Sequence, residues 1–86
     1  MLEISRFFGI VIRMFFNDHD PPHFHAIYGD AEARIDITTL EVRRGALPRR
    51  ALGMVIERAS QHRHELHDDW DRARRGIQPY PIAPLD

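Results

Sequence analysis

Residues 23–37 read HFHAIYGDAEARIDI, and this stretch decides the fold. Two runs alternate between apolar and polar residues on either side of a Gly-Asp pair, a pattern typical of a β-hairpin with a tight turn. A two-residue turn fixes the register, so that His25 faces Arg34. In the same register His23 faces Asp36, and all four side chains share one side of the hairpin. The opposite side carries three apolar pairs that we expect to face the core: Phe24 with Ile35, Ala26 with Ala33, and Tyr28 with Ala31.

The segments that flank this hairpin predict more strands before it and a helix after it. Residues 4–16 alternate with a period of two, which indicates a strand pair or one long bent strand, with Gly9 as a turn or bulge. A further short strand is expected at residues 40–43. Six apolar residues of the first segment share one parity: Ile4, Phe8, Ile10, Ile12, Met14 and Phe16. From Pro48 onwards the apolar residues recur with a helical period: Leu52, Val55, Ile56, Ala59, Leu66, Trp70, Ala73 and Ile77.

The expected fold class is therefore α+β, with a small antiparallel sheet followed by one long or kinked C-terminal α-helix. We expect three to five strands, because the chain offers that many alternating segments. The sheet is placed at about residues 3–43, the helix at about 48–75, and an extended tail at 77–86. All of this forms a single domain of 86 residues, 1–86.

Composition excludes several classes of site. The chain has no cysteine, which rules out disulfides and thiolate zinc sites. All twelve basic residues are arginine, so that a Schiff-base or phosphate-loop lysine is impossible. A net charge of −1 gives no global electrostatic case for nucleic-acid binding. The start of the chain lacks the layout of a signal peptide and no apolar run is long enough to span a bilayer, so we expect a cytoplasmic protein with no membrane partner.

The richest group of potential ligands lies between residues 18 and 25. His23 and His25 are two apart on the expected strand, so both rings project from one face and can bind one metal ion. A third ligand is expected from the preceding loop, supplied by His19, Asp18 or Asp20. Imidazole and carboxylate ligands suit zinc, manganese, iron or nickel. A divalent metal and the absence of any cofactor are equally compatible with this pattern.

Two alternatives use the same hairpin without a metal. His23 and His25 are candidate acid–base residues, with Asp36 orienting one ring and Arg34 binding a phosphate or carboxylate, as metal-free RNA cleavage requires. In a metal site, Asp36 would instead fix the tautomer of His23 from the second coordination shell. The structural alternative is that both histidines are polar-face residues bonded to Asp36 and to the loop backbone.

Arginine pairs form a further candidate site. Arg43-Arg44 and Arg49-Arg50 bracket residues 45–48, and together they offer contacts for an anion or a nucleic-acid phosphate. Because the patch is small and the net charge negative, ion pairs with Glu41 or Glu57 are the competing interpretation.

Four segments together resemble a known family. They are SRFFGI at 5–10, FND at 16–18, PPHFHAIYG at 21–29 and GALPRRAL at 45–52. The chain is similar, from about Glu3 to Gly76, to the small bacterial family named domain of unknown function four-one-six-zero, with Pro-Pro-His-Phe-His-Ala as its specific signature. The resemblance implies a stand-alone cytoplasmic protein encoded beside another small domain, as in a toxin–antitoxin pair. It supplies no catalytic residues, and Arg58 stands where members commonly have tryptophan.

Three functions follow from these observations. The first is a small cytoplasmic interaction protein of a toxin–antitoxin-like gene pair, acting with a protein partner or as a homodimer. The second is a metal-binding or RNA-cleaving site on the His23/His25 hairpin. The third is nucleic-acid binding through the arginine pairs. The lack of a complete catalytic set favours a role other than an enzyme.

Overall fold

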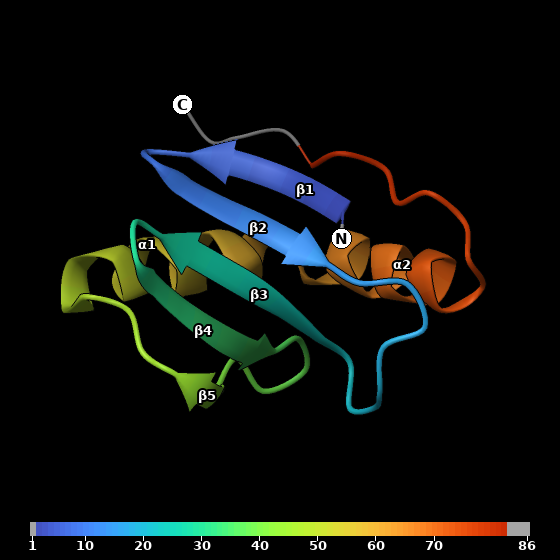
Figure 1. Ribbon diagram of the computed structural model, residues 1–86, viewed down its shortest axis with the longest axis horizontal. Coiled ribbons are helices and arrows are strands. Elements are labelled where there is room, and N and C mark those ends of the chain that lie inside the picture. Colours follow the sequence, from blue (N-terminus) through green and yellow to red (C-terminus); the bar gives the residue numbers. More distant parts are fainter. Residues whose placement is uncertain (1, 83–86) are drawn as a thin grey trace.

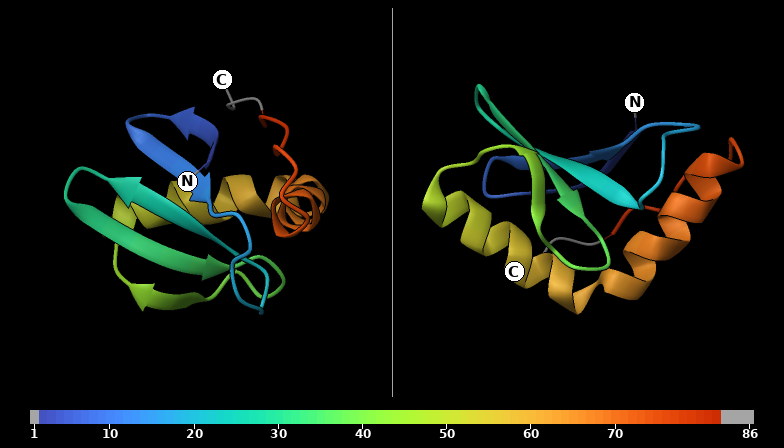
Figure 2. Two further views of the ribbon diagram at one scale, coloured as in Figure 1. Left: turned by 45° about the vertical axis from the view of Figure 1, so that its right-hand side comes forward. Right: turned by 90° about the horizontal axis from the view of Figure 1, so that it is seen from below.

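A five-stranded antiparallel sheet and two helices make up residues 2–82, the part of the chain that the computed structural model describes. The strands follow one another across the sheet in chain order, and both helices cover one face of it (Figures 1 and 2). This arrangement confirms the expected α+β class. The elements are β1 (Leu2–Phe7), β2 (Ile10–Met14), β3 (His23–Tyr28), β4 (Ala31–Asp36), β5 (Val42–Gly45), α1 (Arg49–Gln61) and α2 (Arg63–Arg74).

The central hairpin has the register that the sequence predicts. β3 and β4 pair so that His25 lies opposite Arg34 and His23 opposite Asp36. Phe24 and Ile35 from the other side are buried in the core beneath the sheet. The outer face of the hairpin, turned away from the helices, therefore carries the polar row.

The first two strands form a pair rather than one bent strand. Phe8 and Gly9 both have positive φ, at 49° and 78°, as the two-residue hairpin turn requires. A β-bulge between Glu3 and Ser5 shifts the alternation of β1, so that Phe7 is buried. Phe8 follows β1 in the turn and is 69% exposed. The expectation that Phe8 lies on the core-facing side is therefore wrong.

The fifth strand begins two residues later than the predicted strand at 40–43. The carboxylate of Asp36 accepts the backbone N–H groups of Thr38 and Thr39 at 2.7 and 2.9 Å, which builds a turn after β4. Leu40 has a φ of 62° within this turn and cannot continue a strand. At the end of β5, Gly45 has a φ of 72°, and a Cβ atom there would overlap the carbonyl oxygen of Glu32.

Two helices replace the one long or kinked helix that the sequence predicts. The chain breaks at His62, whose φ and ψ of −123° and 23° lie outside the helical region. A straight helix over residues 49–74 would be about 39 Å long, which exceeds the longest dimension of the molecule, 33 Å. The bend keeps both helices against the same sheet (Figure 2). Val55 of α1 and Trp70 of α2 belong to one hydrophobic core.

The chain after α2 returns along β1. The backbone N–H of Ile82 donates to the carbonyl of Ile4 at 2.8 Å, and the side chain of Ile82 is buried. Ile77, expected in the apolar stripe, lies beyond the end of α2 and is 49% exposed. Residues 83–86 of the expected extended tail lie outside the described residues. No helix between residues 2 and 82 has the length and apolar character needed to cross a membrane.

Candidate metal centre

The segment between β2 and β3 runs past the end of the sheet beside α2 (Figure 1) and carries Asp18 to the two strand histidines. Nε2 of His23 lies 2.9 Å from Oδ2 of Asp18, and Nε2 of His25 lies 3.6 Å from the same oxygen. The other carboxylate oxygen of Asp18 accepts the backbone N–H of His19 at 2.8 Å. That bond fixes the carboxylate, so that Oδ2 faces both imidazoles.

The backbone sets the tautomer of His23. Its Nδ1 lies 2.8 Å from the carbonyl oxygen of Pro21, which can only accept a hydrogen bond, so Nδ1 carries a proton. A neutral His23 therefore presents the lone pair of Nε2 to the carboxylate of Asp18. Two acceptors at 2.9 Å repel each other unless a proton or a cation lies between them.

A carboxylate sets the tautomer of His25 in the same way. Nδ1 of His25 donates to Oε2 of Glu32 at 3.1 Å, which leaves Nε2 as the acceptor. This Nε2 is buried and has no hydrogen-bond partner among the described residues. Both rings thus hold their Nδ1 protons outward and direct their Nε2 lone pairs at one oxygen, the arrangement of metal-ligating histidines with a second coordination shell.

The separations suit a first-row metal ion. One ligand atom from each of Asp18, His23 and His25 lies within 4.8 Å of the others. Ligand atoms about 2.1 Å from an ion lie about 3.0 to 3.4 Å apart at octahedral and tetrahedral angles. The two measured nitrogen–oxygen distances, 2.9 and 3.6 Å, bracket this range. Small side-chain adjustments therefore bring the three donors into coordination.

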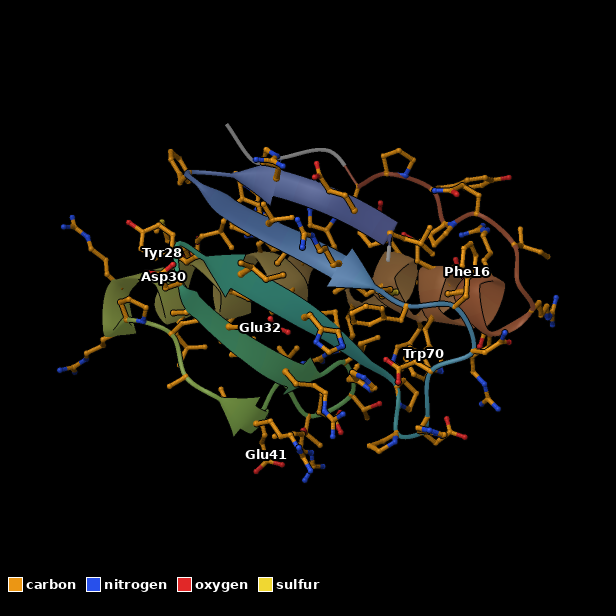
Figure 3. The ribbon with its side chains drawn as sticks, in the orientation of Figure 1. Phe16, Tyr28, Asp30, Glu32, Glu41 and Trp70 are labelled. Atoms are coloured by element: carbon orange, nitrogen blue, oxygen red, sulfur yellow. The ribbon has the colours of Figure 1, made fainter. Side chains whose placement is uncertain are left out.

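Aromatic rings support the two imidazoles. Phe15 meets the ring of His25 edge-on at a centroid distance of 4.7 Å, and Trp70 lies 5.0 Å from the ring of His23. Trp70 reaches this position from α2, next to the segment that joins β2 and β3 (Figure 3). His23 is only 3% exposed, so its ring is held in place by packing as well as by hydrogen bonds.

Electrostatics keep Asp18 ionised. Burial alone raises the pKa of its carboxyl, but the His19 N–H and the neighbouring imidazoles of His23 and His25 hold the pKa below its ordinary value. An ionised carboxylate is the form that binds a cation. The charges of Asp18 and Glu32 together would balance one divalent ion.

The structure brings together only some of the predicted ligands. His19 is exposed, and Asp20 makes an ion pair with Arg74 at 3.0 Å, so neither faces the two strand histidines. Of the three loop candidates, Asp18 alone joins the cluster.

Asp36 does not orient His23, contrary to the expectation from their cross-strand pairing. Its Oδ1 holds the turn after β4, and its Oδ2 accepts from Arg43 at 3.1 Å. Burial raises the pKa of Asp36, but the N–H groups of Thr39 and Thr38 and the Arg43 guanidinium hold it below its ordinary value. The ring of His23 is instead held by Pro21.

Glu32 is the functional residue that the sequence interpretation missed. It lies on the outer face of the sheet (Figure 3), two residues before Arg34 on β4. Its side chain contacts His25, which lies diagonally across from it on β3. Diagonal neighbours on paired strands are within reach of long side chains. The predicted register therefore already placed Glu32 within reach of His25.

The arginine pairs occupy different parts of the molecule. Arg49 and Arg50 begin α1, at the far end of the sheet from the segment joining β2 and β3 (Figure 1). Arg43 and Arg44 lie on β5, where Arg43 pairs with Asp36. The two arginine pairs therefore do not form one patch.

Comparison with known proteins gives one match. A family model with the description "Domain of unknown function (DUF4160)" matches residues 9–71. This range contains the four strands β2 to β5, the helix α1 and most of α2. The matched range contains Asp18, His23 and His25. No curated protein and no solved structure matches the chain.

Proposed function

The chain belongs to the family described as Domain of unknown function (DUF4160), and we propose that it binds one divalent metal ion through Asp18, His23 and His25. The observation that carries this proposal is the convergence of two Nε2 lone pairs on one carboxylate oxygen. Each lone pair is directed there because the Nδ1 proton of the same ring is held elsewhere, by Pro21 or by Glu32.

A metal ion accounts for this geometry better than a shared proton does. One proton on His23 would satisfy the 2.9 Å contact with Asp18, but it would leave the buried Nε2 of His25 without a partner. An unsatisfied buried polar atom costs about 1–3 kcal/mol. One cation bound to Asp18 satisfies both rings at once. Metal-free acid–base catalysis would also require Asp36 to orient one of the rings, but Asp36 is bonded to Arg43.

The ligand set narrows the choice of metal. Two imidazoles and one carboxylate form the set that binds iron(II) in many non-haem centres and zinc in many hydrolases. Structural zinc sites have four protein ligands, whereas three leave positions open for water or a substrate. A bound ion would therefore act as a Lewis acid and lower the pKa of its own water.

The test is calorimetric titration of the metal-free protein with zinc and with manganese. We expect one ion per chain. Asp18→Asn removes the shared carboxylate charge and should weaken binding by about 100-fold or more, since even second-shell changes cost about 10- to 100-fold. Asp20→Asn is the matched control, because Asp20 lies two residues away in the same loop and pairs with Arg74.

Two results would contradict the proposal. One is a wild-type protein that binds neither ion with a stoichiometry near one. The other is equal loss of affinity in Asp18→Asn and Asp20→Asn, which would indicate diffuse attraction to a charged loop.

The wider role of the protein remains a prediction from the sequence. The resemblance favours a cytoplasmic bacterial protein that acts with a partner encoded beside it, as in a toxin–antitoxin-like pair. The exposed rings of Phe8 and Tyr28 support a contact surface for such a partner, since both lie at the same end of the sheet. Co-purification with the neighbouring gene product, and its loss in Phe8→Ser, tests this second role.

A further inference from the structure

An open groove runs beside the candidate metal centre. It is lined by three residues of the segment leading into β3, the first residue of β3, one residue of β4 and two of β5: His19, Asp20, Pro21, His23, Arg34, Arg43 and Arg44. Three of these side chains are arginines and one is a carboxylate. The groove is therefore cationic, although the chain as a whole has a net charge of −1.

Two of the groove arginines make no ion pair with any carboxylate in the part of the chain that the structure describes. Arg34 and Arg44 lie directly opposite each other on β4 and β5. Within residues 2–82 neither has a carboxylate within ion-pair distance, whereas Arg43 is bound to Asp36. Like charges directly opposite on paired strands are destabilising. An anion between the two guanidinium groups would remove that repulsion.

The same pair adjoins the metal centre. Arg34 lies opposite His25, so that His25, Arg34 and Arg44 form one row across three neighbouring strands on the outer face. His23 belongs to both the groove lining and the ligand set. An ion held by three protein ligands has open positions, and the groove reaches the candidate centre at the ring of His23.

We propose that this groove binds a phosphate group, which Arg34 and Arg44 hold through charge-assisted hydrogen bonds while one oxygen reaches the metal ion. The metal contact rests on the proposed function, whereas the arginine contacts do not. Phosphate is favoured because its oxygens can be shared among two guanidinium forks and a metal ion, and a planar carboxylate has only two oxygens to share. The phosphate can belong to a small phosphate ester or to a nucleic-acid strand.

The experiment uses inorganic phosphate and a single-stranded RNA hexamer as probes. Each is titrated at low salt into the metal-free and the manganese-loaded protein, and binding is measured by calorimetry. We expect Arg34→Gln and Arg44→Gln each to weaken binding by about tenfold or more, because each removes hydrogen bonds to a charged group. Arg49→Gln is the matched control, because Arg49 is also exposed but begins α1 away from the groove.

The two probes distinguish the sources of the phosphate. Binding of the hexamer with a salt-dependent affinity, and of inorganic phosphate only weakly, supports a nucleic-acid strand. Comparable binding of both supports a small phosphate ester. Manganese should strengthen binding of the preferred probe in either case.

The outcomes also separate this inference from the proposed function. If manganese binds but neither probe does, the groove proposal fails and the metal site stands. If a probe binds through Arg34 and Arg44 but manganese does not bind, the metal site fails and the arginine contacts stand. Equal loss of affinity in Arg34→Gln and Arg49→Gln would overturn the groove proposal, because any surface arginine would then serve.

Discussion

Replacing His25 with alanine tests the metal centre while leaving most of the core intact. His25 lies on the outer face of β3, and its ring contacts Phe15, Glu32 and the ring of His23. His23 is less suitable, since it is 3% exposed and packs against Trp70. His23→Ala would therefore lower stability through packing as well as through loss of a ligand.

The expected size of the effect follows from linkage between binding and folding. At a free zinc concentration 100-fold above its dissociation constant, binding stabilises the folded state by about 2.7 kcal/mol. For a domain of this length 1 kcal/mol corresponds to about 4–8 °C in Tm, so zinc should raise the wild-type Tm by about 10–20 °C. If His25→Ala weakens binding about 100-fold, the same zinc concentration adds only about 0.4 kcal/mol, or about 2–3 °C.

The assay is thermal unfolding followed by circular dichroism, with and without zinc, for each variant. Comparing each variant with its own metal-free form cancels the change in baseline stability that the substitution causes. His64→Ala is the control, because its side chain is 92% exposed on α2 and lies beside Asp68, away from the candidate ligands. That variant should keep the full zinc-induced rise in Tm.

One result would refute the reasoning. If zinc raises the Tm of His25→Ala as much as that of the wild-type protein, His25 is not a ligand. The convergence of its Nε2 on Asp18 would then be a packing feature alone.

Three further outcomes are expected. Glu32→Gln should lower metal affinity by about 10- to 100-fold and leave the metal-free Tm unchanged, since the Glu32 side chain is 56% exposed. The control is Glu41→Gln, which should change neither the affinity nor the Tm, because the Glu41 side chain is 67% exposed. Nickel should quench the fluorescence of Trp70, the single tryptophan of the chain, because its ring lies 5.0 Å from that of His23, and quenching that persists in His23→Ala would contradict the assignment. Because the pKa of Asp36 is lowered in the fold, its contribution to stability is present above its ordinary pKa and is lost as the pH falls through the folded value. Asp36→Asn should therefore reduce the acid-dependent part of the unfolding free energy measured in urea.

The hairpin could be predicted from sequence because its determinants are local. Alternation with a period of two and a Gly-Asp turn specify the register without reference to the rest of the chain. The register then places His25 opposite Arg34 and brings both histidines to one face, as the structure has them.

The features that the sequence interpretation missed depend on contacts between distant segments. The bulge in β1 shifts its alternation so that Phe7 is buried, and no local residue signals it. The break at His62 fits the helices within the 33 Å length of the molecule, a quantity that becomes known only when the fold is assembled. The late start of β5 arises because Asp36 binds the backbone of the following turn.

The candidate site also combines features set by local sequence with features set by contacts between distant segments. The spacing of His23 and His25 identifies them as a pair, since alternate strand residues share a face. The choice of Asp18 over Asp20 depends on the path of the loop, and Arg74 of α2 binds the second of these carboxylates. Glu32 enters only through a diagonal contact across the hairpin.

The most direct test of the metal centre is nitrogen-15 NMR of the histidine rings during a zinc titration. We expect the Nε2 signals of His23 and His25 to shift together and to stop changing at one equivalent of zinc. Their Nδ1 atoms should stay protonated, because Pro21 and Glu32 hold those protons. Nε2 signals that ignore zinc, or that shift only along with those of exposed histidines such as His64, would contradict the proposal that Asp18, His23 and His25 form a metal site.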